Sequence, residues 1–481
     1  MSFNSWQYLI FLVVTIVLYY LFRQKYRNYI LLVASYFFYM CAVPKYALLL
    51  LFSTIISYIF ARILEKEPGD KRKAWLVIGL ILCMMPLFFL KYFDFFGECI
   101  SSILVPLGFS VLPRLDILLP IGISFYTFTV TGYLIDVYRK KSAAEHDFIC
   151  YSLFVSFFPS LLSGPIERFD NMMPQLKTKH TFTSDNIKTG ILRFLWGLFK
   201  KMVIADQLAI IVNAVYGSPL EYSGLQTVLA VCAFSIQIYC DFSAYSDMAI
   251  GSASMLGFTL TENFDAPYLT TSVKGFWRRW HISLTSWFRD YLYFPLGGSR
   301  CSKVRSMFNV LIVFLVSGLW HGAGVTFVIW GLLNGIYQIA GDILAPVRKS
   351  IRSFMHISDK NIVLKAFQYV FTFILITVSW IFFRAESVDK AYMVIRQIFT
   401  GSEAISLAGI GLSLAELIEV CIFIAILGVI DALSKKYQLE KKVNDTVWLR
   451  YAVYLILIMI ILIFGAYGPG YDPQDFVYFK F

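Results

Sequence analysis

The stretch FWRRWHISLTSWFRDYLYFPLGGSR, residues 276–300, concentrates tryptophan, arginine and tyrosine in a chain that is otherwise apolar. His281 lies at its centre, and the segment SGLWHGAGVTFVIWG, residues 317–331, places His321 at the start of a long apolar run. The other three histidines, at positions 146, 180 and 356, have polar, loop-like neighbours. An ionisable residue at membrane depth is costly and is therefore a functional-site hypothesis. We interpret the rest of the chain as a scaffold for His281 and His321.

The composition is that of a membrane protein. The 481 residues are 58% hydrophobic and only 15% charged, against about 25% charged in soluble proteins, and the mean hydropathy is +0.67. Continuous apolar runs favour helices over a barrel. We expect an all-α polytopic membrane protein with roughly 11–13 transmembrane helices plus re-entrant or interfacial helices. One integral-membrane domain would cover 1–481, with N-terminal helices at 1–115, a core at 116–343 and C-terminal helices with a tip at 344–481.

The net charge of +11 does not indicate nucleic-acid binding, because lysine and arginine gather in short loops such as 23–27 and 65–73. That distribution is the positive-inside bias of an integral protein. It predicts that these loops are cytoplasmic, that the N-terminus lies outside, and, by the span count, that the C-terminal DPQDFVYFKF also lies outside. The eight scattered cysteines contain no C-x-x-C and predict neither a disulfide framework nor a zinc site.

Two segments do not look like simple spans. Residues 99–112 are apolar but short, and we expect them to re-enter or to lie in the interface. Residues 148–169 are interrupted by Pro159, Gly164 and Pro165. Broken helices at membrane depth are tolerated only where they line protein or a water-filled cavity. The end of this segment, with Glu167 and Arg168, predicts a structural corner.

Residues 277–291 form an amphipathic pattern when they are placed on a helix. One arc is aromatic and apolar and the opposite side is cationic and polar, with His281 at the edge of the aromatic arc; the aromatic arc holds Trp277, Trp280, Leu284, Trp287, Phe288 and Tyr291, and the polar side holds Arg278, Arg279, Ser283, Ser286, Arg289 and Asp290. The pattern predicts a helix at an interface or folded back into the protein. An interfacial anchor and a ligand site both remain open.

His321 is flanked by Trp320 and Gly322, with Gly318 before them. Small residues allow another backbone or a substrate to approach closely. A neutral imidazole can take a proton from a hydroxyl as that hydroxyl attacks a carbonyl. The alternative is a core histidine that is hydrogen-bonded across a helix pair. Neither candidate histidine has a second histidine four residues away, so no metal site is predicted.

A third cluster, IQIYCDFSAYSDMAIG at 236–251, contains Gln237, Asp241, Tyr245 and Asp247. Two carboxylates between apolar runs are costly unless they are paired. The arginines at 278, 279 and 289 are the expected partners. A structural ion pair that closes the helix bundle is the alternative to a supporting role in a site.

Four long motifs resemble the membrane-bound O-acyltransferase (MBOAT) superfamily: ENFDAPYLTTSVKGFWRRWHISLTSWFRDYLYFPLGGSR at 262–300, GLWHGAGVTFVIWG at 318–331, IYCDFSAYSDMAIG at 238–251 and LLSGPIERF at 161–169. PIGISFYTF at 120–128 and FVYFKF at 476–481 are similar to the bacterial branch that contains the alginate O-acetylation membrane subunit. The resemblance covers most of residues 1–340 and the C-terminal tip.

The resemblance implies helices around a central tunnel between a cytoplasmic donor entrance and an outer acceptor funnel. It implies an O-acetyltransferase that uses an acyl thioester, acetyl-CoA, with no bound cofactor. The acceptor would be a hydroxyl of an exported polysaccharide, reached with an extracytoplasmic partner acetyltransferase. The protein would lie in a bacterial cell membrane. His321 matches the catalytic histidine and would be the general base; His281 matches the second position and would orient it or hydrogen-bond the thioester carbonyl. Supporting candidates are Trp277, Arg278, Trp280, Ser283, Asp241, Tyr245, Asp247, Gln237 and Trp320.

Three other functions stay open at this point. D-alanyl transfer to teichoic acid from a carrier protein is the nearest one within the family. A proton-coupled transporter could use the two histidines as a proton relay. A structural subunit of a polysaccharide export complex would need His321 for assembly and not for chemistry.

Overall fold

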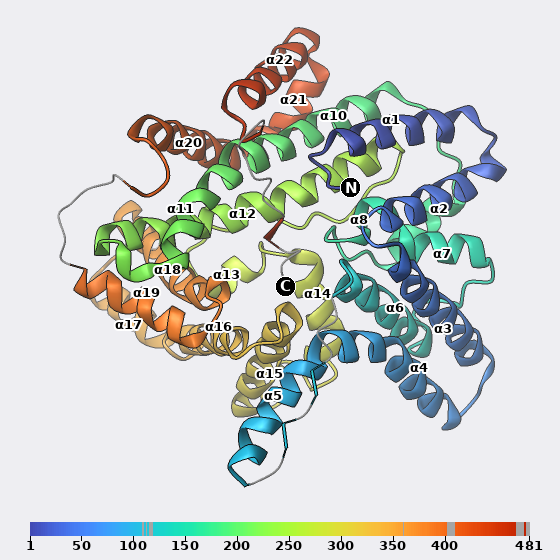
Figure 1. Cartoon of the computed structure of the whole chain (residues 1–481), viewed down its shortest axis with the longest axis horizontal. Coiled ribbons are helices and arrows are strands. Elements are labelled where there is room, and N and C mark those ends of the chain that lie inside the picture. The colour runs from blue at the N-terminus through green and yellow to red at the C-terminus, as the bar shows by residue number, and fades with distance from the viewer. Residues whose placement is uncertain are drawn as a thin grey trace. The chain divides into compact units, whose positions relative to one another are not determined.

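The computed structural model describes residues 1–107, 110–111, 113–114, 119–358, 360–401, 409–467 and 476–477, and Figure 1 displays its ribbon. Every regular element within these ranges is a helix, which confirms the predicted all-α class. The physical reason is that lipid offers no hydrogen-bond partners, so that each apolar segment satisfies its own backbone groups by forming a helix.

The described chain divides into two compact units. Unit 1 contains Met1–Phe194 and Tyr245–Thr261, and unit 2 contains Leu195–Ala244 and Glu262–Phe481.

Unit 1 holds the N-terminal helices, with the first part of α10 and the last part of α12. Its elements are α1 (Trp6–Leu21), α2 (Gln24–Met40), η1 (Pro44–Tyr46), α3 (Ala47–Lys66), α4 (Lys71–Leu87), η2 (Phe88–Tyr92), α5 (Phe93–Leu104), η3 (Val105–Leu107), α6 (Ile123–Tyr138), α7 (Phe148–Ser156), α8 (Phe158–Leu161), α9 (Phe169–Lys177) and α10 (Ser184–Phe199). Within this unit α3 packs against α4, α6 and α7, and α2 packs against α7.

Unit 2 holds the rest of α10 and α12 and all later elements. These are η4 (Lys200–Ala205), α11 (Asp206–Gly217), η5 (Pro219–Glu221), α12 (Gly224–Met255), α13 (Val273–Trp277), α14 (Ile282–Phe288), η6 (Arg289–Tyr293), α15 (Lys303–His321), α16 (Val325–Ile343), α17 (Ala345–Phe354), α18 (Ile362–Arg384), α19 (Val388–Thr400), α20 (Leu414–Tyr437), α21 (Leu439–Asp445) and α22 (Val447–Phe464). Figure 1 shows α15 and α16 running side by side.

Seven helices in the described part of the chain are long and apolar enough to cross a membrane, and eight if α16 and α17, bent by 46°, form one span. The sequence predicted roughly 11–13. Part of the difference comes from short helices: α1 and α6 each have only 16 residues. The segment 148–169 is divided among α7, α8 and the start of α9, as its prolines and glycine predicted.

The segment predicted to re-enter begins inside a longer helical stretch. α4, η2, α5 and η3 follow one another without a break, and Lys71–Leu107 forms a single candidate span of 37 residues. Residues 99–107 therefore continue a preceding helix and do not start a separate element. Residues 108, 109 and 112 lie outside the described part of the chain.

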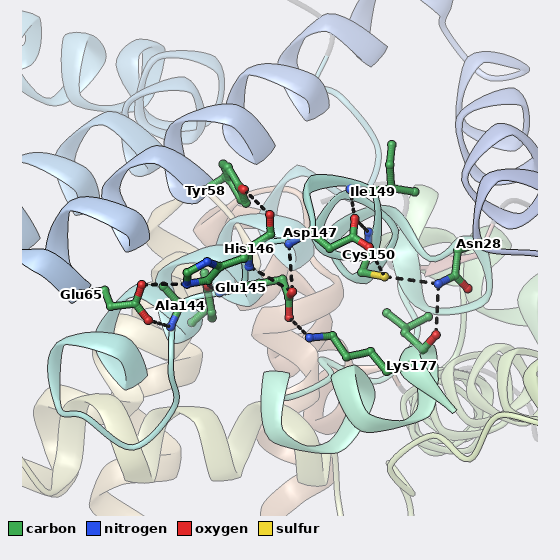
Figure 2. A network of polar contacts seen from close by, with 12 residues as sticks. Asn28, Tyr58, Glu65, Ala144, Glu145, His146, Asp147, Ile149, Cys150 and Lys177 are labelled. Carbon is green, nitrogen blue, oxygen red and sulfur yellow. Dashed lines mark hydrogen bonds and ion pairs between the residues drawn. The ribbon is translucent and has the colours of Figure 1, made fainter. Parts of the chain in front are cut away.

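A polar network in unit 1 anchors the loop between α6 and α7, as Figure 2 shows. The Glu65 carboxylate of α3 lies 3.0 Å from Nε2 of His146 and accepts the Ala144 amide. Glu145 accepts the amides of His146 and Asp147 and pairs with Lys177 of α9 at 2.7 Å. His146 therefore lies in a polar loop, as predicted, and the network ties α3 and α9 to the start of α7.

Candidate active site

The predicted helix over 277–291 is wrong, because the structure breaks it at His281. α13 ends at Trp277 and α14 begins at Ile282. His281 has φ 45° and ψ 56°, a left-handed conformation that a residue with a Cβ rarely adopts. Two backbone hydrogen bonds hold the turn: the Asp265 amide donates to the Arg279 carbonyl, and the Ile282 amide donates to the Asn263 carbonyl, both at 3.0 Å.

The Asn263 side chain lies directly against this turn. Its Oδ1 accepts the Ser283 amide at 3.2 Å and the Ser283 hydroxyl at 2.8 Å, and it lies 3.2 Å from His281 Nδ1. Asn263, His281 and Ser283 are all almost fully buried. This segment lies between the candidate spans α12 and α15. Burial lowers the pKa of His281 to about 3, so its ring is neutral near pH 7.

His321 is the last residue of α15 and is 4% exposed. Its ring lies 4.8 Å from the ring of Trp320, 5.1 Å from Trp330 and 5.3 Å from Phe383. The Trp320 ring also lies 6.0 Å from the His281 ring. The two candidate histidines therefore contact the same tryptophan, although 39 residues separate them in the sequence.

Two of five buried tryptophans, Trp320 and Trp330, contact these histidines directly, and the other three pack behind Trp330. We call the five the tryptophan cluster: Trp277, Trp280, Trp320, Trp330 and Trp380. Trp330 stacks on Trp380 at 5.7 Å, and Trp380 lies 5.2 Å from Trp280. Trp277 lies 5.6 Å from Trp330 and donates to Asn334 at 3.2 Å. Aromatic walls exclude water, which strengthens the electrostatic interactions of any group enclosed with the histidines.

Close packing of α15 on α16 positions His321. Gly318 and Gly331 face the partner helix so tightly that a Cβ on either would collide with a backbone carbonyl, that of Phe327 or that of Phe314. Small residues are what allow two helices in a membrane to approach this closely. The glycines of the segment 317–331 thus bring the end of α15 into the tryptophan cluster.

Asp241 has a different partner from the one predicted. It pairs with Lys201 at 2.8 Å, and Lys201 also pairs with Asp206 at 2.9 Å. The Val477 amide donates to the second oxygen of Asp241 at 2.7 Å. All three charged side chains are almost fully buried. Expected partners Arg279 and Arg289 instead contact the Leu269 carbonyl and Asp290.

Tyr245 and Asp247 belong to unit 1 and not to the unit that contains the histidines. The Tyr245 ring stacks on Phe3 at 4.5 Å. Asp247 pairs with Arg193 at 2.6 Å, where the sequence had predicted an arginine of the 278–289 segment. Glu167, also in unit 1, is buried at the predicted corner and accepts the Thr261 amide at 2.6 Å.

The remaining predicted residues are less central. Arg278 is exposed, while Gln237 is buried in α12. His180 contacts the Gln175 carbonyl at 2.8 Å, and His356 is exposed after α17. No group of three or more histidine, cysteine, aspartate or glutamate side chains in the described ranges is arranged to hold a metal ion.

Four residues near the histidines were not predicted from the sequence: Asn263, Trp330, Trp380 and Phe383. Asn263 lies in the quoted motif ENFDAPY, but a single asparagine carries no periodic signal. Trp380 and Phe383 lie in an apolar run after residue 345 that looked like an ordinary span. Only the packing of Phe383 on His321 and of Trp380 on Trp280 and Trp330 distinguishes them.

The sequence of the chain is similar to known proteins of one enzyme family. Residues 138–384 match the model of the MBOAT, membrane-bound O-acyltransferase, family. The probable alginate O-acetylase AlgI of Pseudomonas aeruginosa is 38% identical, over 81% of this chain and 73% of that protein. A peptidoglycan O-acetyltransferase of Helicobacter pylori is 35% identical, over 81% and 76%.

A teichoic acid D-alanyltransferase of Bacillus subtilis is more distant, with 28% identity over 51% of this chain and 67% of its own length. The matched residues 138–384 include both histidines, Asn263 and the whole tryptophan cluster. The chain therefore belongs to the membrane-bound O-acyltransferase family and is a multi-pass membrane acyltransferase.

Proposed function

We propose that this protein transfers an acetyl group from a thioester donor to hydroxyl groups of an exported polysaccharide. The observation that carries the proposal is that two buried histidines contact the same buried tryptophan, Trp320. The relatives of the chain include a probable alginate O-acetylase and a peptidoglycan O-acetyltransferase. The donor is acetyl-CoA on the cytoplasmic side, and an extracytoplasmic partner acetyltransferase passes the group to the glycan. The protein lies in a bacterial cell membrane with both termini outside; residues 478–481 lie beyond the described part of the chain.

His321 is the general base of this proposal. Its neutral imidazole accepts the proton of the acceptor hydroxyl or of a relay group as the oxygen attacks the thioester carbonyl. A carbon–oxygen bond forms, the carbon–sulfur bond breaks, and the departing thiolate takes up the proton that His321 accepted. An imidazole enclosed by aromatic side chains stays desolvated, so it does not lose this proton to bulk water.

The other site residues support the histidines. Trp320 contacts both histidines, Trp277 and Trp280 pack on Trp330 and Trp380, and Ser283 fixes the turn that carries His281. Asp241 and Gln237 stabilise unit 2 through α12, and Tyr245 and Asp247 stabilise unit 1. Arg278, which is exposed, meets lipid headgroups.

The test is the mass of the exported glycans from cells that carry wild type, His321→Gln or His321→Ala at equal membrane abundance. Both variants should remove acetyl groups from one glycan, which would also identify the acceptor. His356→Ala is the matched control, since His356 is exposed after α17, and it should leave acetylation unchanged.

Unchanged acetylation of every glycan in the His321 variants would overturn the proposal. A loss of D-alanine esters in place of acetyl groups would assign the protein to teichoic acid modification. If neither His321 variant can be brought to the membrane abundance of wild type, while His356→Ala can, the role of a structural subunit is favoured.

A further inference from the structure

The contacts around Asn263 Oδ1 assign a proton position to His281. A main-chain N–H can only donate, and the Ser283 amide donates to this atom at 3.2 Å. The atom must therefore be the carbonyl oxygen of the asparagine side chain, whichever way the amide group is built. An oxygen of this kind only accepts. His281 Nδ1, which lies 3.2 Å from it, can form a hydrogen bond there only if it carries the hydrogen.

We infer that Asn263 is a positioning residue that holds His281 in the Nδ1–H tautomer and thereby makes Nε2 the acceptor atom of this ring. In a neutral imidazole one nitrogen carries the hydrogen and the other has the lone pair. His281 therefore accepts a hydrogen bond or a proton in the reaction and does not donate to the thioester carbonyl. This replaces the donor role that the family resemblance had offered for His281. The inference deepens the proposed function. It rests on that function only for the statement that His281 takes part in acyl transfer.

Burial makes this assignment consequential. His281 is 1% exposed and Asn263 is fully buried, so water does not compete for Nδ1. The left-handed turn at His281 fixes the direction of the ring, because the Asn263 carbonyl also accepts the Ile282 amide at 3.0 Å. Asn263 thus binds both the Ile282 amide, through its main-chain carbonyl, and the His281 ring, through its side chain. Partners of a histidine that set its tautomer are a known way to fix which nitrogen reacts.

The direct test is the nitrogen NMR spectrum of histidine-labelled full-length protein in lipid, with His281→Asn used to assign the His281 signals. The expected spectrum shows a protonated Nδ1 and an unprotonated Nε2 near pH 7. A protonated Nε2 in the wild-type protein would overturn the inference. The measurement needs no acyl transfer, so it stands even if no glycan proves to be the acceptor.

Variants separate positioning from packing. Asn263→Ala should abolish the pure Nδ1–H signal and lower transfer at least tenfold. Asn263→Asp keeps an acceptor at the same atom, so it should keep the Nδ1–H tautomer, and its negative charge should move the acid limb of the pH–rate profile to higher pH. An unchanged spectrum and pH profile in both variants would contradict the role of Asn263.

Asn309 is the matched control. It is also a buried asparagine of unit 2, and its amide donates to the Leu296 and Gly298 carbonyls at 3.2 Å. Asn309→Ala should lower thermal stability without changing the His281 signals or the pH profile. If Asn263→Ala does not fold, the wild-type spectrum and the Asn263→Asp profile still decide the question.

Discussion

At the scale of single residues, His281 combines a strained backbone with a buried ring. A left-handed residue with a Cβ costs about 1–2 kcal/mol relative to the usual helical conformation. Such strain persists only where surrounding contacts determine it, and here the Asn263 backbone and side chain supply those contacts. The strain is the cost of turning the imidazole inward between α13 and α14.

A pair of substitutions tests this strain. His281→Gly should be more stable than His281→Ala by about 1 kcal/mol, because glycine adopts φ 45° without a steric penalty. The two variants lack the ring equally, so thermal unfolding in detergent isolates the backbone effect. Ser286 inside α14 is the control, since there the order should reverse and alanine should be more stable than glycine by about 1 kcal/mol. Equal stabilities of the two His281 variants would contradict the strain.

At the scale of elements, the α15–α16 pair matters most because His321 is the last residue of α15. The pair is joined by three residues, 322–324, and Gly318 and Gly331 allow contact between the two backbones. Small residues near His321 predicted a close approach, but the order of the residues does not show which helix they face. The structure answers that question, because α16 itself fills the space next to Gly318.

Gly331→Ala tests the close approach of the two helices. The added Cβ would collide with the Phe314 carbonyl, so we expect a loss of about 1–3 kcal/mol from overpacking and at least a tenfold loss of transfer through displacement of His321. Gly341→Ala on the same helix is the control, since its Cβ meets nothing within 4 Å. That substitution should be neutral or stabilising by up to about 1 kcal/mol. Thermal unfolding and glycan acetylation measure both variants, and a harmless Gly331→Ala would disprove the packing argument.

At the scale of the whole molecule, residues far apart in sequence meet in buried ionic contacts within unit 2. Lys201 lies between Asp206 and Asp241, and Asp241 also accepts the amide of Val477 near the end of the chain. A buried charge without its partner is much more costly than a buried pair. The arrangement joins η4, α11, α12 and the C-terminal residues 476–477 into one structure.

Lys201→Met should destabilise the protein by about 3–5 kcal/mol, because it leaves two buried carboxylates without their cation. Adding Asp241→Asn should recover part of the loss. Lys390→Met removes the exposed pair with Glu386 and should change stability by less than about 1 kcal/mol. The melting temperatures of wild type, the two single variants and the double variant in detergent provide the comparison. Equal effects at Lys201 and Lys390 would show that the buried contacts contribute little.

The sequence by itself determined the class and family of this protein. Apolar runs dictate helices wherever lipid replaces water, and the prolines and glycine between 159 and 165 predicted the break after α7. The long motifs around His281 and His321 resembled the family to which the chain belongs. These features are local in the chain, so residue order alone carries them.

Only the tertiary structure decided how the site is built. A helical period over 277–291 favoured one continuous helix, but the contacts of Asn263 stabilise a left-handed break at His281 that no local pattern encodes. Asp241 pairs with Lys201, 40 residues earlier, and Trp380 reaches the tryptophan cluster from α18. Each of these contacts joins residues that are distant in sequence. Their free energy depends on packing in three dimensions, which is why they could not be predicted from the order of the residues.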